Sequence, residues 1–298
     1  MNFTATDLKV LMIGNSFSIC VGRNLPQLVA HENKHSLELT NAYIGGCKFI
    51  QHAENLRKAE EDNSFKPYTI NTWTSKDLRK THKRKGNVNE LLKNNQYDII
   101  TIQQGSLHSF DYKLYQPYAN ELIAYIKKYN PQAEIVIQET WSYRADAPFL
   151  QNNNMSQSEM TSKIIDAYKK FAKETKFRLI PTGRAFEIAR KNPTYQYKML
   201  SEKELAKFVC PDLPPRAHDV VGKHFWAKTD NGMQLLSDTI HLNEHGEYLQ
   251  ACVWYSFLFG ENSENITYET RLNPENIKIL RSAAAQAIKE YKYTVLSV

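Results

Sequence analysis

Short apolar runs alternate along this chain with segments in which apolar residues recur at helical spacing. The runs suited to buried strands are residues 8–13, 36–42, 97–103, 134–138 and 177–180. The expected helices are residues 19–31, 48–63, 88–94, 115–129, 158–175, 183–191 and 247–259. Strands that alternate with helices predict right-handed crossovers and a parallel sheet that helices cover on both faces. We therefore expect an α/β protein, a three-layer αβα sandwich with a central parallel sheet of about five strands, flavodoxin-like in arrangement.

Three segments depart from this alternation. Residues 68–74 predict an extra short strand. Residues 192–236 hold Pro211, Pro214 and Pro215 and little periodicity, so we expect a long irregular excursion near the functional site. Residues 273–291 begin with a good cap and a proline, and they predict a C-terminal helix. No Pro/Gly/Ser-rich linker divides the chain, so we expect one domain over residues 1–298.

Composition and charge narrow the class of protein only slightly. The chain has 298 residues, of which 42% are hydrophobic and 23% are charged, as is ordinary for a globular protein. Part of the net charge of +6 comes from a basic cluster made up of Lys76, Arg79, Lys80, Lys83, Arg84 and Lys85. A patch for nucleic acid or an acidic glycan is one interpretation. Because no nucleic-acid-binding motif accompanies the cluster, we interpret it as a solvated loop or helix face and expect no nucleic-acid partner.

The cysteine spacing and the hydropathy of the chain argue against further classes of protein. Cysteines occur at Cys20, Cys47, Cys210 and Cys252, far apart and without a Cys-x-x-Cys pair. This spacing argues against a zinc knuckle or a redox motif and leaves the disulfide state open. No apolar run approaches the length of a membrane-spanning helix, and the N-terminus lacks a signal-peptide pattern. We expect a cytoplasmic protein, or a periplasmic or secreted one if an export signal has been removed, and the sequence leaves the compartment open.

A serine stands where the first apolar run ends. The run stops abruptly at Gly14-Asn15-Ser16, and a helical pattern follows. A serine on such a strand-to-helix turn can expose its hydroxyl beside the free N–H groups of the helix, which favour a nearby anion. Ser16 is therefore a candidate nucleophile, although serine is also favoured as a helix N-cap. A nucleophilic serine requires a histidine to accept its proton and a carboxylate to orient that histidine.

A second motif, far along the chain, supplies both groups. Asp238 and His241 form an Asp-x-x-His pair just before the helix expected at 247–259, and we expect the pair to lie on a loop. The carboxylate of Asp238 can accept a hydrogen bond from one imidazole nitrogen and leave the other basic toward Ser16. Asp238 as a plain turn residue is the competing interpretation. We interpret His245 as a solvent-facing helix residue outside the site.

At these residues the chain resembles the SGNH (GDSL-like) hydrolase family over most of its length. The family's first block, Gly-Asp/Asn-Ser, is matched by Gly14, Asn15 and Ser16, and its last block, Asp-x-x-His, by Asp238 and His241. Residues Leu242, Asn243 and Gly246 match a common extension of the last block. The resemblance implies the SGNH fold and an oxyanion hole formed by the backbone N–H groups of Ser16 and of a second-block glycine. Gly46, rather than Gly45, matches that glycine.

The third block departs from the family pattern. The family has Gly-x-Asn-Asp after the third strand, and its asparagine amide helps to bind the oxyanion. Here the strand ends Gln103-Gln104-Gly105-Ser106-Leu107-His108, so Leu107 occupies the asparagine position and has no donor. A glutamine amide carries the same donor, so Gln103 or Gln104 is a candidate replacement. Because neighbouring strand residues point opposite ways, at most one of them faces the site.

Substrate contacts are expected on the same side of the sheet. The candidates are Asn15, His108 and Trp141, and Trp141 with Tyr143 could form a stacking wall for a sugar ring. The competing interpretation of both aromatics is a partly buried rim. His218, His224 and Asp219 match no common ligand spacing, so we predict no metal and no cofactor.

Together these residues predict a serine hydrolase that acts on ester bonds. The resemblance implies short acyl groups, with acetyl on a carbohydrate as the first substrate hypothesis; the Gln-Gln-Gly-Ser block is similar to a poorly characterised bacterial branch. The expected partner is a small-molecule or glycan ester. The altered third block also allows a catalytically weak or inactive glycan-binding protein on the same fold, and a lipase or thioesterase is a further alternative. The natural ester and the oligomeric state stay open.

Overall fold

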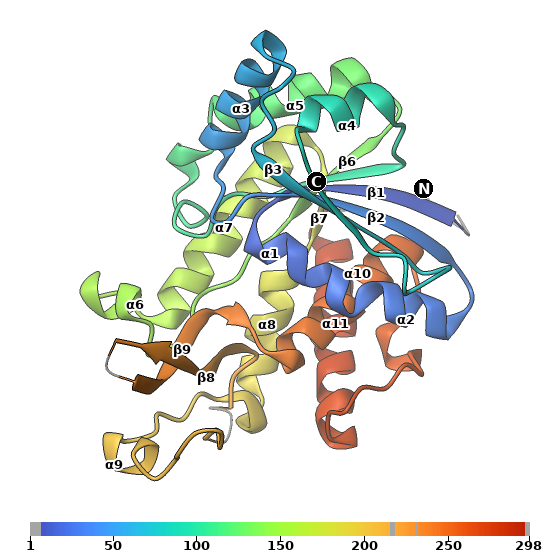
Figure 1. The fold of residues 1–298 in the computed structure, drawn as a ribbon. Coiled ribbons are helices and arrows are strands. Elements are labelled where there is room, and N and C mark those ends of the chain that lie inside the picture. The colour runs from blue at the N-terminus through green and yellow to red at the C-terminus, as the bar shows by residue number, and fades with distance from the viewer. Residues whose placement is uncertain (1–6, 215–217, 231, 296–298) are drawn as a thin grey trace.

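A seven-stranded sheet forms the centre of the protein (Figure 1). The structure, a computed structural model, describes residues 7–214, 218–230 and 232–295. The strands lie in the order β4-β3-β2-β1-β5-β6-β7. Their bounds are β1 Asp7–Gly14, β2 Ser36–Tyr43, β3 Tyr68–Thr74, β4 His82–Gly86, β5 Ile99–Ile102, β6 Glu134–Gln138 and β7 Arg178–Ile180. The neighbouring strands β2, β1, β5, β6 and β7 are parallel, which confirms the expected sheet and its flavodoxin-like order.

Two antiparallel strands extend the sheet beyond the expected five. The stretch 68–74 forms β3, which pairs with β2, and β4 pairs with the far side of β3. The prediction of a loop or helix face for the basic cluster is therefore wrong over residues 82–86. Four of the five β4 residues are exposed, so no apolar alternation marks the strand. Lysine and arginine side chains on an edge strand disfavour pairing with another sheet, and this accounts for much of the cluster.

Helices cover both faces of the sheet. One face carries α3 Phe49–Glu61, α4 Val88–Asn94, α5 Tyr118–Tyr129 and α7 Gln157–Thr175. The other face carries α1 Ser16–Ile19, η1 Cys20–Arg23, α2 Leu25–Glu32, α8 Thr182–Lys191, α10 Glu244–Phe259 and α11 Pro274–Val295. The short elements α6 Pro148–Asn152, α9 Glu202–Leu205, η2 Tyr112–Leu114, η3 Pro193–Tyr195 and η4 Ser263–Asn265 lie in the connections. No helix in the described part of the chain is long and apolar enough to cross a membrane.

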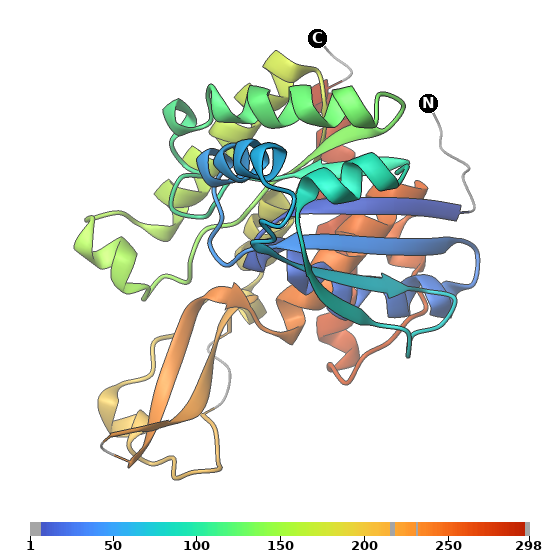
Figure 2. The ribbon, with the colours of Figure 1, turned by 45° about the horizontal axis from the view of Figure 1, so that its top comes forward.

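The expected irregular excursion contains regular structure. Strands β8 Val221–Thr229 and β9 Gly232–Leu242 form a separate antiparallel hairpin that projects from the body of the protein (Figure 2). The prediction of an irregular segment through residue 236 is thus wrong for the hairpin, and it holds better for residues 196–214, where α9 is one short helix. Many residues of the hairpin are exposed or only partly buried, so the strands show little of the apolar pattern that marks a buried strand.

Candidate active site

Ser16 lies at the sharp turn between β1 and α1, as the first residue of the helix. The N-cap of α1 is Asn15, whose side chain accepts a hydrogen bond from the Phe17 N–H at 3.0 Å. A Cβ at Gly14 would lie 2.6 Å from the Ser18 hydroxyl, so the turn requires glycine there. Because Asn15 caps the helix, the competing interpretation of Ser16 as an N-cap does not hold. The hydroxyl of Ser16 is left for other partners.

The structure brings Ser16, His241 and Asp238 together across 225 residues of sequence. The hydroxyl of Ser16 lies 2.9 Å from Nε2 of His241. Nδ1 of His241 lies 2.8 Å from one carboxylate oxygen of Asp238. The other carboxylate oxygen, Oδ1, accepts the backbone N–H groups of Ile240 and His241 at 2.9 and 3.0 Å. The turn that follows Asp238 is therefore closed by the same carboxylate that contacts the imidazole.

The environment of Asp238 keeps its carboxyl group ionised. Partial burial by itself raises the pKa, but the hydrogen bonds from the His241 side chain and from the backbone N–H groups of His241 and Ile240 outweigh it. The net effect is a pKa well below the ordinary value for an aspartate. An ionised carboxylate only accepts hydrogen bonds, so Nδ1 carries the imidazole proton. Nε2 then presents its lone pair to the hydroxyl of Ser16.

Asp238 and His241 lie near the end of β9, and not on a loop as the sequence predicts. Asn243 follows the strand and caps α10 by accepting the N–H groups of His245 and Gly246. Its amide nitrogen donates to the carbonyls of Asp219 and Gly222, at 2.6 and 3.0 Å. The strand end is therefore bonded to both the following helix and β8. His245, expected to face solvent, is partly buried and contacts the Tyr195 hydroxyl at 2.9 Å.

Trp141 supports the site from inside the protein and cannot stack on a substrate. Its side chain is 1% exposed and packs face to face on Phe17, with ring centroids 3.9 Å apart. Its indole N–H donates to the carbonyl of Ile240 at 3.0 Å. Tyr143 is also buried, and its hydroxyl donates to Ser106. The expected stacking wall is therefore wrong, because neither ring presents a free face.

A buried arginine holds the same strand, and sequence reasoning missed it. The backbone N–H of Arg144 donates to the carbonyl of Thr239 at 2.9 Å, and its guanidinium donates to the Ser237 hydroxyl at 2.6 Å. The guanidinium also forms a two-bond ion pair with Asp146, at 2.6 and 2.8 Å. The backbone of Arg144 thus holds Thr239, and its guanidinium, on a side chain that is 1% exposed, holds Ser237 on the other side of Asp238. No local pattern distinguishes this arginine from a surface one.

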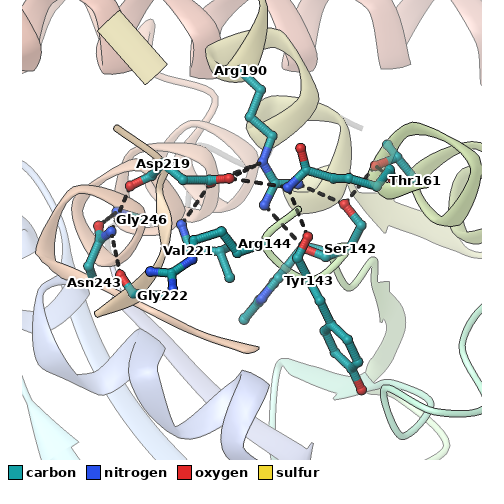
Figure 3. A network of polar contacts seen from close by, with 12 residues as sticks. Ser142, Tyr143, Arg144, Thr161, Arg190, Asp219, Val221, Gly222, Asn243 and Gly246 are labelled. Atoms are coloured by element: carbon teal, nitrogen blue, oxygen red, sulfur yellow. Dashed lines mark hydrogen bonds and ion pairs between the residues drawn. The ribbon is translucent and has the colours of Figure 1, made fainter. Parts of the chain in front are cut away.

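A second buried ion pair holds the base of the hairpin (Figure 3). Nε of Arg190, on α8, lies 3.0 Å from the carboxylate of Asp219, and its guanidinium also donates to the hydroxyl and carbonyl of Ser142. Asp219 accepts the backbone N–H of Val221 as well. The carboxylate considered as a metal ligand therefore holds an arginine. No group of three or more metal-binding side chains occurs within the described residues.

Gly46 lies on the turn that follows β2 and adopts a φ of +63°, which glycine tolerates best. The amide nitrogen of Asn15 donates to the carbonyl of Cys47 at 2.9 Å, so this turn is tied to the turn that carries Ser16. Among the described residues no protein group accepts the N–H of Gly46. The N–H of Ser16, the first in its helix, likewise has no intrahelical acceptor. Two backbone donors are thus left free on adjoining turns.

The two glutamines after β5 have different surroundings. The amide nitrogen of Gln103 donates to Oδ1 of Asn15 at 2.8 Å. The oxygen of Gln104 accepts the N–H groups of Phe49 and Gly105, and its nitrogen donates to a backbone carbonyl. The expectation of Gln104 as an oxyanion donor is therefore wrong, because its side chain is buried and its amide oxygen and nitrogen both bond backbone groups away from Ser16. Only Gln103 reaches the turn of Ser16, and it does so through Asn15.

The remaining candidates differ in accessibility. Asn15 is 2% exposed, and both its amide oxygen and its amide nitrogen bond other parts of the protein, so the expected substrate contact is wrong. His108 is partly exposed on the turn after β5, and burial, followed by the charge of Lys48, lowers the pKa of its imidazole. Leu107, in the family's asparagine position, is 46% exposed and offers no donor. His108 is thus the expected substrate contact that stays accessible.

Comparison with known proteins identifies the family of the chain. The family model DUF4886, described as a domain of unknown function, matches residues 9–203. A DUF4886 family protein from Bacteroides uniformis is similar in structure, with a TM-score of 0.75 and 24% identity over 95% of each chain. A protein from Slackia heliotrinireducens described as a "putative SGNH hydrolase" has a TM-score of 0.51 and 16% identity over 85% of this chain and 99% of its own.

These likenesses define the fold and the family. No curated protein matches the sequence significantly. The solved relatives show that the architecture is the SGNH hydrolase fold, as the resemblance implies. The family match includes Ser16 and Gln103 and ends before Asp238 and His241. The chain belongs to the DUF4886 family.

Proposed function

We propose that this protein is a serine esterase that hydrolyses short-chain esters, with acetyl esters of carbohydrates as the first substrate class. The observation that carries the proposal is the hydrogen-bonded series from Ser16 to His241, 2.9 Å, and from His241 to Asp238, 2.8 Å. A nucleophile, a base and an orienting carboxylate in this order perform acyl transfer on several unrelated folds. The SGNH fold supports the same class of reaction.

In the proposed reaction Ser16 attacks the ester carbonyl while Nε2 of His241 accepts its proton. The imidazolium that forms is stabilised by the ionised carboxylate of Asp238, which itself stays unprotonated. His241 returns the proton to the alcohol oxygen as the bond from the carbonyl carbon to that oxygen breaks. Water, deprotonated by the same histidine, then attacks the acyl-enzyme and releases the acid and free Ser16.

The free N–H groups of Ser16 and Gly46 are the proposed oxyanion donors. Preorganised backbone donors stabilise the tetrahedral intermediate because they need no reorientation as its charge develops. Leu107 removes the third donor that the family pattern supplies. We assign Gln103 a positioning role, since its amide holds Asn15 and Asn15 in turn holds both adjoining turns.

One observation favours a second candidate function. Leu107 offers no donor, and losing one oxyanion donor lowers the rate by roughly 10²–10³. A protein with this change could retain a glycan site and hydrolyse slowly or not at all. The two candidates differ in whether Ser16 is chemically activated.

Labelling with a fluorophosphonate distinguishes the candidates. We expect covalent modification at Ser16, found by peptide mass spectrometry, because an activated serine attacks phosphorus as it attacks an ester carbonyl. The variant His241→Ala should lose the label, and His245→Ala is the matched control, since that histidine contacts Tyr195 instead. A wild-type protein that stays unmodified would favour the glycan-binding candidate.

The variant Gln103→Met separates a positioning role from direct oxyanion binding. We expect kcat for p-nitrophenyl acetate to fall by about tenfold, because Asn15 loses one of its partners. A loss of roughly 10²–10³ would instead indicate that Gln103 itself donates to the oxyanion. As a control, Gln104→Met should lower the free energy of unfolding by about 2–3 kcal/mol and change kcat much less, since it leaves buried backbone groups unpaired.

A further inference from the structure

A lysine lies beside the proposed oxyanion turn, and no carboxylate among the described residues pairs with it. Lys48 follows Gly46 and Cys47, and its side chain is partly buried. A Cβ at Gly105 would lie 2.7 Å from Cγ of Lys48 and 2.9 Å from the carbonyl of Cys47, so the lysine stem packs directly on the turn after β5. In the part of the chain that the structure describes, Lys48 forms no ion pair.

The other cations near the site are neutralised. The guanidinium of Arg144 is paired with Asp146, and that of Arg190 with Asp219. These pairs are buried and satisfy their own charges. Lys48 is therefore a positive charge without an ion-pair partner among the described residues, and it lies beyond the carboxyl end of β2, on the turn that carries Gly46.

His108 approaches the same place from the neighbouring turn. Residues 105–108 form a turn closed by a 2.8 Å bond from the N–H of His108 to the carbonyl of Gly105. Burial and the charge of Lys48 lower the pKa of His108, and Asp111 opposes them. A neutral imidazole donates one hydrogen bond, so His108 can assist a cation that binds an anion. The carboxylate of Asp111 is used to cap η2 by accepting the N–H of Lys113.

We infer that the natural ester carries a carboxylate close to its scissile bond, and that Lys48 and His108 bind this group. The inference rests on the proposed esterase function and names its substrate class. The stem of Lys48 is held against Gly105, so a substrate carboxylate would meet a positioned ammonium and give it a charged partner. Neutral acetyl esters remain substrates, because the reacting groups do not involve Lys48, but they do not use this contact.

Paired substrates test the inference. On the acyl side, p-nitrophenyl hemisuccinate is compared with p-nitrophenyl butyrate; on the alcohol side, p-acetoxybenzoate is compared with phenyl acetate. Wild-type protein should prefer the anionic member of one pair in kcat/KM, and Lys48→Gln should lower kcat/KM for that ester by about tenfold, mainly through KM. The neutral esters should change by less than about twofold, and Lys48→Arg should retain the preference.

Two controls isolate the charge. Lys85→Gln removes the same charge from exposed strand β4 and should leave all four esters unchanged. About 1 M salt, at which the Debye length is about 3 Å, should reduce the wild-type preference for the anionic ester and leave neutral esters unaffected. If neutral esters are cleaved by a reaction that depends on Ser16 and Lys48→Gln slows neither anionic ester, the inference is wrong while the proposed function stands. If no ester is cleaved, the inference and the proposed function are both wrong.

Discussion

Replacing Ser16 by alanine is expected to lower kcat for p-nitrophenyl acetate by about 10⁴-fold or more, since the variant has no nucleophile to form the acyl-enzyme. The rate that remains should come from the free backbone donors and from substrate binding alone. Initial rates of nitrophenolate release, corrected for spontaneous hydrolysis, measure the change. Equal rates for the wild-type protein and the variant would exclude Ser16 as the nucleophile.

We expect Ser16→Ala to lower kcat because it removes the nucleophile, and not because it destabilises the protein. Asn15 caps α1, and the strand-to-helix turn is held by Gly14, Asn15 and Gln103. Within the described residues, His241 is the one hydrogen-bond partner of the Ser16 hydroxyl. The melting temperature of Ser16→Ala should therefore stay close to that of the wild-type protein. A large drop in melting temperature would show that Ser16 stabilises the turn.

The variant Asp238→Asn is expected to lower kcat by about 10³–10⁴-fold. Oδ1 of Asp238 accepts two backbone N–H groups, so the asparagine oxygen would keep that place and its NH₂ group would face Nδ1 of His241. The NH₂ group donates to Nδ1, which moves the imidazole proton to Nε2. A protonated Nε2 cannot accept the proton of Ser16. The measurement is kcat against pH, and a variant with wild-type kcat would remove Asp238 from the mechanism.

The same variant has a pH-dependent effect on stability. The pKa of Asp238 lies below its ordinary value of 3.8 in the folded protein, so the ionised group stabilises the fold above that pH. This stabilisation is lost as the pH falls through the lower folded value. We therefore expect the difference in unfolding free energy between wild type and Asp238→Asn to be largest near neutral pH and to shrink on acidification. A difference that does not change with pH would contradict the ionised state of the group.

Much of the fold follows from local sequence. Residues 88–94 and 134–138 have the predicted type and bounds, because apolar spacing along a few turns or strand positions reports which face is buried. Strand β4 and the hairpin were not predicted, since their side chains are largely exposed and their pairing depends on a distant partner. The helix expected over residues 19–31 is divided into η1 and α2, with Pro26 in the first turn of α2.

The residues of the candidate site also comprise some that the sequence identifies and others that only the structure reveals. Gly14, Ser16, Asp238 and His241 are recognisable because each motif is short and its chemistry needs few residue types. The burial and the direction of a side chain are not evident from such motifs, because they depend on which distant segment packs against the residue. Trp141 is an expected sugar contact, but it packs against Phe17 and supports the site from the interior of the protein.

Two short motifs thus identify the residue types that the reaction needs, whereas the arrangement of these residues depends on contacts between segments far apart in the sequence. Gln103 and Gln104 are identical in type and adjacent, yet one bonds Asn15 and the other bonds the start of α3. Arg144 bonds Ser237 and Thr239 on the strand of Asp238, and Arg190 pairs with Asp219 at the base of the hairpin; no local pattern predicts these contacts. These hydrogen-bond and ion-pair partners are determined only when the chain is folded, since a hydrogen bond requires two groups that lie within about 3 Å and are correctly oriented.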